Sequence, residues 1–290
     1  MTGLETINDL SRRVAHASKS AWRRAYSDFL MPDRLDTYGT LIQSARDHGY
    51  CIHSIFSFWQ LLKSKTVDLG DKYIILRHDV DDDPGSARRM WQLEVQLGVC
   101  SSSYYFRLST ADATLMRDIA QSGQEVSYHY EELSSMAREA GFTSKEEVYA
   151  AMPQIRDLFR HNLAHLREST GLPMRTVAAH GDFVNRRLGI PNQVILAEAE
   201  LRHEMDIELE AYDRTFLGEM TAEHSDERYP QVWLYADPGT SIRDGKPVLH
   251  IIVHPQNWHS SIRVTMPADA ERIWQGLAYR WAAHSRRNRQ

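Results

Sequence analysis

Apolar residues recur at helical spacing in the first part of the chain, and this spacing changes only near residue 70. Residues 1–30 carry such positions with arginines between them, which predicts a surface helix that ends before Pro32. The segments "TYGTLIQSARDHG" (37–49) and "SIFSFWQLLKSK" (54–65) follow the same pattern and predict two further helices. We therefore expect residues 1–70 to form a helical extension.

Beyond this point, continuous apolar runs take the place of the helical spacing. "KYIILRHDVD" (72–81) is an apolar run that ends in charged residues, which is typical of a buried parallel strand with an exposed tip. Further strands are predicted at residues 101–108, 125–130, 175–181, 231–237 and 247–255. Helices are predicted at residues 84–98, 112–123, 145–169 and 267–285. Residues 191–230 show no clear pattern.

Strands that alternate with helices predict an α/β fold with a parallel sheet, either open or closed into a barrel. No internal repeat or linker divides the sequence after the helical extension. We therefore expect one domain over residues 71–290, preceded by the extension over residues 1–70.

Composition narrows the classes of function. The chain has 290 residues, of which 42% are apolar and 25% charged, and its net charge of −5 argues against a nucleic-acid partner. The two cysteines, Cys51 and Cys100, suit a reducing compartment. No signal-peptide core and no apolar run of membrane-spanning length occur, so we expect a cytoplasmic protein without a membrane span.

Acidic and histidine residues stand at the carboxyl ends of four predicted strands. These residues are Asp79 and Asp81, His129, His180, and His254. Ligands bind at this edge of parallel α/β sheets. Carboxylate together with imidazole suits Zn²⁺ and other divalent metals, so Asp81 is a candidate metal ligand and Asp79 a candidate general base.

Four motifs occur in the order in which one family of hydrolases carries them: "LRHDVD" (76–81), "EVSYHYEE" (125–132), "AAHGDF" (178–183) and "IIVHPQNW" (251–258). Over roughly residues 70–260 the chain resembles the polysaccharide deacetylase family with the NodB-type domain, similar to carbohydrate esterase family 4. It resembles the cytoplasmic branches that have Asp-Val-Asp in the first motif and are met in surface-polysaccharide gene clusters. The resemblance implies a distorted (β/α) barrel and a metal-dependent hydrolase that removes N- or O-acetyl groups from sugars.

The resemblance also implies roles for individual residues. Asp79 matches the general base and Asp81 a metal ligand, while His129 matches the first histidine of a two-histidine metal motif. His254 matches the general acid that protonates the leaving group. A divalent metal is the implied cofactor, with Zn²⁺ favoured, and an acetylated carbohydrate is the implied substrate.

The metal motif departs from the family pattern at one position. The pattern is His-x-x-x-His, but the residue four places after His129 is Leu133. His180 is our candidate for the missing ligand because it ends a neighbouring strand, and Glu131 and Glu132 are less favoured candidates. "HNLAH" (161–165) has the motif's spacing but falls on a predicted helix, where a surface or packing pair is the simpler interpretation.

Several other residues have simpler structural interpretations. Asp82 and Asp83 precede Pro84 and suit the start of a helix. Arg77 and His78 fit either partners of the site or ion-pair residues. The aromatic residues of the strands and of the last motif suit either a sugar subsite or the core, with the core favoured: Tyr104, Tyr105, Tyr128, Tyr130 and Trp258.

Two alternatives to a deacetylase stay open at the level of sequence. "DVD" after an apolar strand also resembles the Asp-x-Asp motif of metal-dependent glycosyltransferases, although little chain precedes it for a nucleoside site. A non-catalytic relative is the second alternative, because the second motif histidine is absent. The sequence selects neither the sugar, nor the N- over the O-acyl position, nor the metal, nor the oligomeric state.

Overall fold

The computed structural model of the chain describes residues 22, 26, 30–68, 70–227, 233, 234, 236–259 and 261–287. The helix predicted over residues 1–30 lies almost entirely outside the described residues. The strand predicted over residues 231–237 was wrong where it can be checked: residues 233, 234, 236 and 237 are described and form no strand. Trp233 makes an isolated antiparallel bridge with Asp226, and Asp237 caps the next helix.

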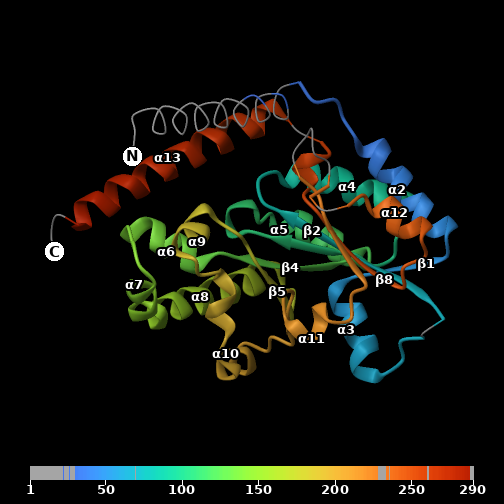
Figure 1. Cartoon of the computed structure of the whole chain (residues 1–290), viewed down its shortest axis with the longest axis horizontal. Helices are drawn as coiled ribbons and strands as arrows, with labels where there is room; N and C mark the ends of the chain where they lie inside the picture. The colour runs from blue at the N-terminus through green and yellow to red at the C-terminus, as the bar shows by residue number, and fades with distance from the viewer. Residues whose placement is uncertain are drawn as a thin grey trace, which may run out of the picture.

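A single sheet with parallel pairing forms the centre of the molecule (Figure 1). Its order is β6-β5-β4-β3-β2-β8-β7, and β1 pairs with the first half of β2. The strands are β1 (Tyr50–His53), β2 (Lys72–Val80), β3 (Ser103–Phe106), β4 (Glu125–Tyr130), β5 (Thr176–Ala179), β6 (Leu209–Glu210), β7 (Ala222–Ser225) and β8 (Val248–Val253). The predicted parallel α/β fold is confirmed as a curled half-barrel, in which the described edge strands β6 and β7 do not pair with each other.

Helices cover both faces of this sheet. They are α2 (Leu35–Asp47), α3 (Ile55–Ser64), α4 (Pro84–Gln96), α5 (Ala113–Gln121), α6 (Glu132–Ala140), α7 (Lys145–Ala150), α8 (Met152–Thr170), α9 (Phe183–Leu188), α10 (Ala199–Glu204), α11 (Arg214–Leu217), α12 (Pro238–Arg243) and α13 (Ile262–Arg287). Figure 1 shows α3 and α11 on one side of the sheet and α2 and α4 on the other. None of the described helices is both long and apolar enough to cross a bilayer.

One predicted helix is divided in the structure, and strand β1 was not predicted. The helix predicted over residues 145–169 is divided at Ala151, and Pro153 stands in the first turn of the second part, where its missing N–H costs nothing. The segment between the two early predicted helices contains strand β1, which pairs with β2. This strand lies within the predicted extension over residues 1–70, and the boundary at residue 70 stays a prediction.

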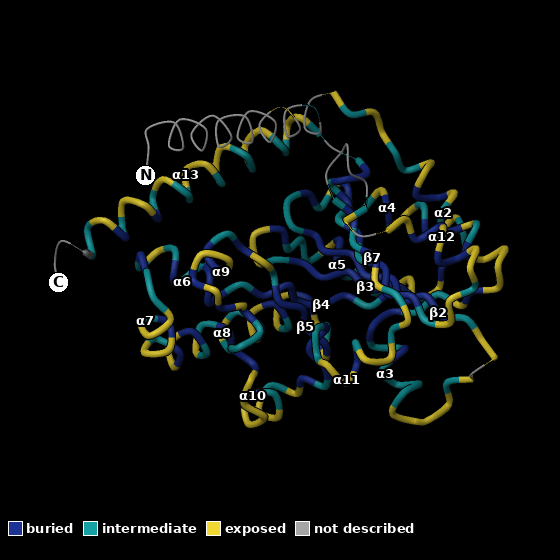
Figure 2. The backbone as a smooth tube through the Cα atoms, in the orientation of Figure 1, coloured by how far each residue is buried: buried dark blue, intermediate teal, exposed yellow. Residues whose placement is uncertain are grey.

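Side chains along each strand alternate between an outer face, toward α2 and α4, and an inner face on the other side of the sheet. Ile74 and Leu76 of β2 pack outward into the cluster that contains residues of α2 and α4. Arg77 and Asp79, two and four positions beyond Ile75, share the inner face with it, and His129 of β4 also faces inward. The strands are buried along most of their length (Figure 2), so this inner face holds charged groups away from bulk water.

Candidate metal and catalytic site

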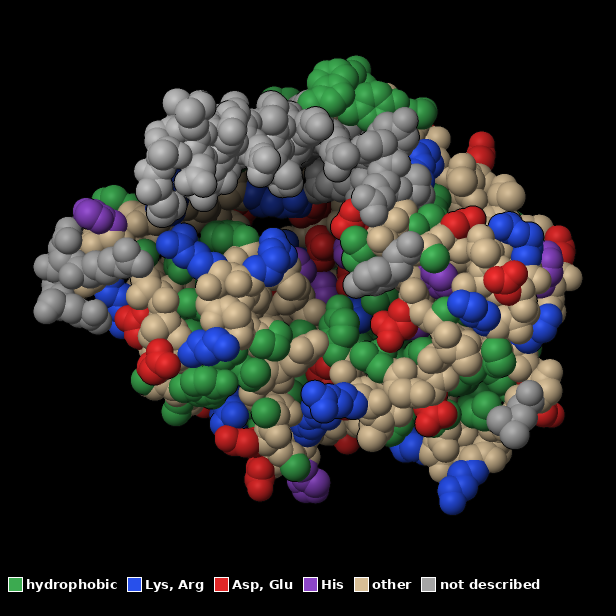
Figure 3. Space-filling model, viewed as in Figure 1, with side chains coloured by type: hydrophobic (Ala, Val, Ile, Leu, Met, Phe, Trp, Pro, Cys, Tyr) green, Lys and Arg blue, Asp and Glu red, His purple; other side chains and the backbone are tan. Residues whose placement is uncertain are grey.

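The five residues predicted at the strand tips come together at the carboxyl edge of the sheet. We call them the tip cluster: Asp79, Asp81, His129, His180 and His254. In the space-filling view, acidic and histidine side chains are visible in a hollow in the middle of the molecule (Figure 3).

Three members of the tip cluster are placed as metal ligands would be. Nε2 of His129 lies 3.4 Å and Nε2 of His180 lies 3.7 Å from Oδ1 of Asp81. One ligand atom from each of the three residues lies within 4.8 Å of the others. One carboxylate and two imidazoles make a donor set that suits a first-row divalent cation.

Asp81 and His129 each keep one atom free to bind a cation: Oδ1 of Asp81 and Nε2 of His129. Oδ1 of Asp81 is buried and has no hydrogen-bond partner among the described residues. His129 points its Nδ1 at the carbonyl oxygen of Ala178, 2.9 Å away, so its Nε2 faces Asp81. Burial raises the pKa of Asp81, but His180, His129 and His254 outweigh it and hold that pKa well below its usual range. A buried anion without a donor is costly, and a cation at this point would satisfy it.

Asp79 lies beside this candidate metal position, next to the same nitrogen of His129 that faces Asp81. Nε and Nη2 of Arg77 donate to its two oxygens at 2.7 and 2.8 Å, and Nη2 also donates to the Tyr212 hydroxyl at 3.1 Å. Nε2 of His129 lies 3.5 Å from Oδ2 of Asp79. Burial raises the pKa of Asp79, but Arg77 and the two nearby histidines more than reverse this effect, so the carboxyl is ionised.

His254 approaches Asp81 from strand β8. Its Nδ1 lies 2.6 Å from Oδ1 of Asp226, and its Nε2 lies 3.8 Å from Oδ2 of Asp81. Asp226 also accepts the His254 backbone N–H at 2.9 Å and the Trp258 indole N–H at 2.7 Å. Burial lowers the pKa of His254, but Asp226 and then the two strand carboxylates raise it to about 10. The raised pKa keeps the His254 ring protonated at neutral pH, and its second nitrogen faces Asp81.

A further ion pair lies behind His180. Arg107 donates from Nε and Nη2 to Oε1 of Glu131 at 3.1 and 2.6 Å, and from Nη1 to the backbone oxygen of Asp81 at 3.1 Å. Oε2 of Glu131 lies 3.3 Å from Nδ1 of His180. Burial raises the pKa of Glu131, but His180 and Arg107 lower it to about 2.

Leu133, which stands four places after His129 where the resembled metal motif has its second histidine, has an apolar side chain that cannot bind a metal. It is fully buried on α6 and packs in the main hydrophobic cluster of the chain. The predicted role of "HNLAH" as a surface pair agrees with the exposure of His161 and His165 on α8.

The remaining sequence interpretations are resolved by direct contacts. Asp83 is the N-cap of α4 and accepts the Gly85 N–H at 2.8 Å, as predicted, whereas Asp82 forms an ion pair with Arg272 of α13. The five aromatic residues considered for a sugar subsite are all buried, which confirms the favoured core interpretation: Tyr104, Tyr105, Tyr128, Tyr130 and Trp258.

Sequence reasoning missed three residues around the site: Asp226 and Arg107, which contact the tip cluster, and Tyr212, whose hydroxyl accepts a hydrogen bond from Arg77. Asp226 follows strand β7 at a strand tip, the same signal that marked Asp79, but it falls in the stretch whose pattern was unclear. Arg107 directly follows β3, and a charged residue at this position was a usable signal. Tyr212 lies in a short loop after β6 and gave no signal.

Comparison with known proteins gives structural neighbours only. No family model and no curated protein match the chain. A carbohydrate esterase family 4 pseudoenzyme from Bacillus anthracis is 11% identical with a TM-score of 0.36, and the match covers 70% of this chain and 60% of that one. The chain thus spans less than two thirds of that protein's length.

Two further neighbours are peptidoglycan deacetylases. The catalytic domain of a peptidoglycan N-acetylglucosamine deacetylase from Eubacterium rectale is 12% identical with a TM-score of 0.40, over 73% of this chain and 87% of that one. A variant of a peptidoglycan deacetylase from Bacillus subtilis is 14% identical with a TM-score of 0.36, over 77% of this chain and 99% of that one. Similarity at 11–14% identity says nothing about which side chains of this chain carry out chemistry.

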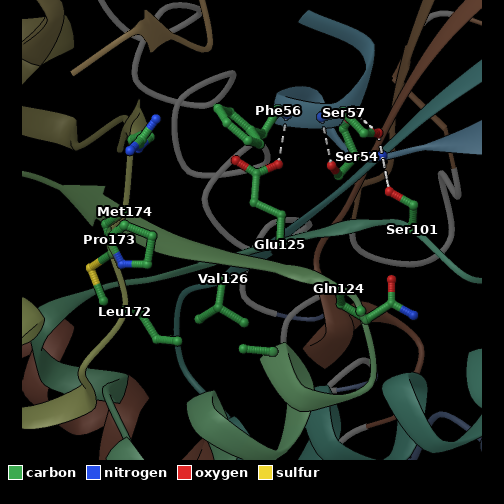
Figure 4. A pocket seen from close by; sticks show the side chains of 13 residues that line it. Ser54, Phe56, Ser57, Ser101, Gln124, Glu125, Val126, Leu172, Pro173 and Met174 are labelled. Atoms are coloured by element: carbon green, nitrogen blue, oxygen red, sulfur yellow. Dashed lines mark hydrogen bonds between the residues drawn. The ribbon is translucent and has the colours of Figure 1, made fainter. Parts of the chain in front are cut away.

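A second polar region lies at the opposite, amino edge of the same sheet and borders a pocket of about 450 Å³ (Figure 4). We call it the start cluster: Ser103, Tyr105, Glu125 and Thr176. Oε2 of Glu125 accepts the Phe56 N–H at 2.9 Å and the Ser103 hydroxyl at 2.7 Å. Its Oε1 accepts the hydroxyls of Tyr105, at 3.3 Å, and Thr176. These contacts join α3 to the sheet and leave both oxygens of Glu125 satisfied.

Proposed function

We propose that the chain is a metal-dependent hydrolase that removes an acetyl or similar acyl group from a carbohydrate. The observation that carries the proposal is the position of the three candidate ligands, Asp81, His129 and His180, between a carboxylate and a cationic imidazole. Hydrolysis of an amide or ester requires a proton acceptor for water and a proton donor for the leaving group, and the site offers one of each.

Asp79 is the residue that accepts the proton of the attacking water. Its ion pair with Arg77 fixes its orientation and keeps it ionised, and its Oδ2 faces the ligand histidine His129. Bound between Asp81, His129 and His180, a divalent ion, for which we propose Zn²⁺, supplies Lewis acidity toward the acyl carbonyl and toward water.

His254 is the residue that donates a proton to the departing amine or alcohol. Asp226 holds it through Nδ1 and leaves Nε2 directed into the site. Protonation at this position avoids expelling an unstable anion, which is the ordinary task of a general acid.

The loop after β5 offers a backbone donor for the developing oxyanion. The His180 N–H is used by the Tyr130 carbonyl, whereas the next N–H, that of Gly181, makes no hydrogen bond within the described part of the chain. A Cβ added to Gly181 would meet no atom within 4 Å, so the space beside this N–H is open. We assign the Gly181 N–H as the oxyanion donor.

The carbohydrate class of the substrate rests on the motif resemblance rather than on a contact. The proposal includes no nucleic-acid partner, because the chain is acidic overall. It also places the protein in the cytoplasm, where the free, exposed Cys51 and Cys100 would stay reduced.

The two alternative functions are less well supported by the site. A glycosyltransferase would use both acids of Asp79-Val80-Asp81 around the metal and nucleotide, but Arg77 engages both oxygens of Asp79. The reason to consider a non-catalytic relative is the missing second histidine of the metal motif. His180 lies beside Asp81 and offers a replacement ligand, so this reason is weaker.

The test compares the wild-type protein with Asp79→Asn and with a matched control, Asp82→Asn. Each variant loses one carboxylate from the acidic segment over residues 79–83. After removal of metal and reloading with Zn²⁺, acetate release is measured on a panel of N- and O-acetylated oligosaccharides. We expect Asp79→Asn to bind Zn²⁺ and to lose at least about a hundredfold in turnover, within the range typical of general-base catalysis. Asp82→Asn should keep both properties. Full activity of Asp79→Asn would overturn the mechanism.

A further inference from the structure

We propose that Glu131, clamped by Arg107, is a positioning residue that orients His180 and so completes the metal site in place of the absent second motif histidine. The inference rests on the proposed function, because it assigns Glu131 a role toward the metal that this function requires. Glu131 stood among the less favoured candidates for a direct metal ligand, and the geometry gives it a different role.

The two ring nitrogens of His180 face different partners. Nε2 lies 3.7 Å from Oδ1 of Asp81, on the side of the candidate metal position. Nδ1 lies 3.3 Å from Oε2 of Glu131, and both of these buried atoms lack any hydrogen-bond partner among the described residues. Because the two nitrogens of an imidazole point away from each other, a carboxylate at Nδ1 does not share the position that Nε2 faces. Glu131 is therefore placed to hold the ring from behind.

The hydrogen bonds from Arg107 to Glu131 fix the carboxylate in a position where it can orient His180. Two guanidinium nitrogens donate to Oε1, which leaves Oε2 for His180. The third nitrogen, Nη1, donates to the backbone oxygen of Asp81 at 3.1 Å. Arg107 thus ties the carboxylate behind one ligand to the backbone of another, and all of these groups are at least partly buried.

His129 shows the corresponding arrangement with a different acceptor. Its Nδ1 faces the carbonyl oxygen of Ala178 at 2.9 Å, while its Nε2 faces Asp81. Both histidines therefore have an acceptor oxygen within 3.3 Å behind Nδ1 and Nε2 directed to the same carboxylate. For His129 the acceptor is a backbone carbonyl of strand β5. His180 lies beyond the end of β5, so its acceptor is the side chain of Glu131.

The test measures Zn²⁺ affinity directly, by competition with a chromogenic chelator, in wild type, Glu131→Ala, Glu131→Gln and a control, Glu132→Gln. Glu132 is the adjacent buried acid, but its carboxylate accepts hydrogen bonds from Tyr128 and Asn162, which are not part of the tip cluster. We expect Glu131→Ala to weaken Zn²⁺ binding about 10- to 100-fold, the scale seen when a carboxylate behind a ligand histidine is removed. Glu131→Gln should lose less, because its amide oxygen can still accept from Nδ1, and Glu132→Gln should bind as wild type does.

The thermal midpoint of the metal-free proteins separates loss of positioning from loss of folding. If Glu131→Ala does not fold, the isosteric Glu131→Gln together with Arg107→Lys carries the test, and both should weaken Zn²⁺ binding. Wild-type affinity in the Glu131 variants would overturn this inference and leave the proposed function intact. Absence of Zn²⁺ binding by the wild-type protein would overturn both.

Discussion

The tip cluster and the start cluster lie at opposite ends of the strands of one sheet, and they differ in how completely their buried polar groups are paired. In the start cluster both oxygens of Glu125 accept hydrogen bonds, and no side-chain nitrogen or oxygen atom of its four residues is buried without a partner among the described residues. At the tips, Oδ1 of Asp81, Oε2 of Glu131 and Nδ1 of His180 are buried and unpaired within the same part of the chain.

This difference separates two uses of buried polar residues. Folded proteins pair nearly all buried polar groups, so the unpaired Oδ1 of Asp81 beside His129 and His180 indicates an absent ligand. Oε2 of Glu131 and Nδ1 of His180, in contrast, face each other behind the ring. The hydrogen bonds around Glu125 are complete, and their role is structural because they join α3 to the sheet. Substitutions at the tips should therefore change metal binding and turnover, whereas substitutions at the start cluster should change stability.

The largest effect is expected for Asp81→Asn. The substitution removes the one anionic donor of the candidate site, so turnover should fall by at least about a hundredfold, the scale of losing one charge-stabilising group. The metal-free variant should also be less stable than wild type at neutral pH, because the three histidines that hold the pKa of Asp81 below its usual range lose their anionic partner. Bound zinc should also be lost; zinc analysis, acetate release and urea unfolding measure metal content, turnover and stability respectively. Loss of stability with retained metal would place Asp81 among structural residues instead.

A pH-dependent effect is expected for Asp226→Asn. Asp226 is the main cause of the raised pKa of His254, about 10, and the active form of a general acid is protonated. Activity should therefore persist to high pH in the wild type and fall as the pH rises through the pKa of His254. Removal of the Asp226 charge should lower that pKa and move the basic limb of kcat/KM to lower pH by about 1–3 units. A basic limb at the same pH in both proteins would show that His254 does not supply the proton.

The smallest effect on activity is expected for Glu125→Gln. The amide keeps the shape of the side chain but replaces an acceptor oxygen by a donor group that faces the N–H of Phe56 or neighbouring hydroxyls. The free energy of unfolding should fall by about 1–3 kcal/mol. Because the start cluster lies at the other end of the strands, kcat/KM should stay within about twofold of wild type. Urea unfolding and acetate release check both parts, and a large loss of turnover at unchanged stability would remove the distinction between the clusters.

The sequence predicted the central strands well because their signal is local. An apolar run that ends in Asp79-Val80-Asp81 marks β2 and its exposed tip together, and the same reasoning applied to β4, β5 and β8. Strands β1, β6 and β7 were missed: β1 lies between two segments with helical spacing, and β6 and β7 fall within residues 191–230, which show no clear pattern.

The partners of the site residues were harder to predict than the site residues themselves. The predicted residues at four strand tips do come together, because parallel strands bring their carboxyl ends to one edge. The pairs Arg107–Glu131 and Asp226–His254 join residues 24 and 28 positions apart, and their contact depends on the register of the sheet. A single sequence contains no direct signal for such pairs.

The most direct test of the account is anomalous diffraction at the zinc edge from crystals of the Zn²⁺-loaded protein. The account predicts one strong peak bonded by Asp81, His129 and His180, at about 2.0–2.2 Å from each ligand atom. Asp79 and His254 should lie on opposite sides of that peak without binding it. A crystal with no zinc at the strand tips, or with zinc held instead by the exposed His161 and His165 of α8, would contradict the account.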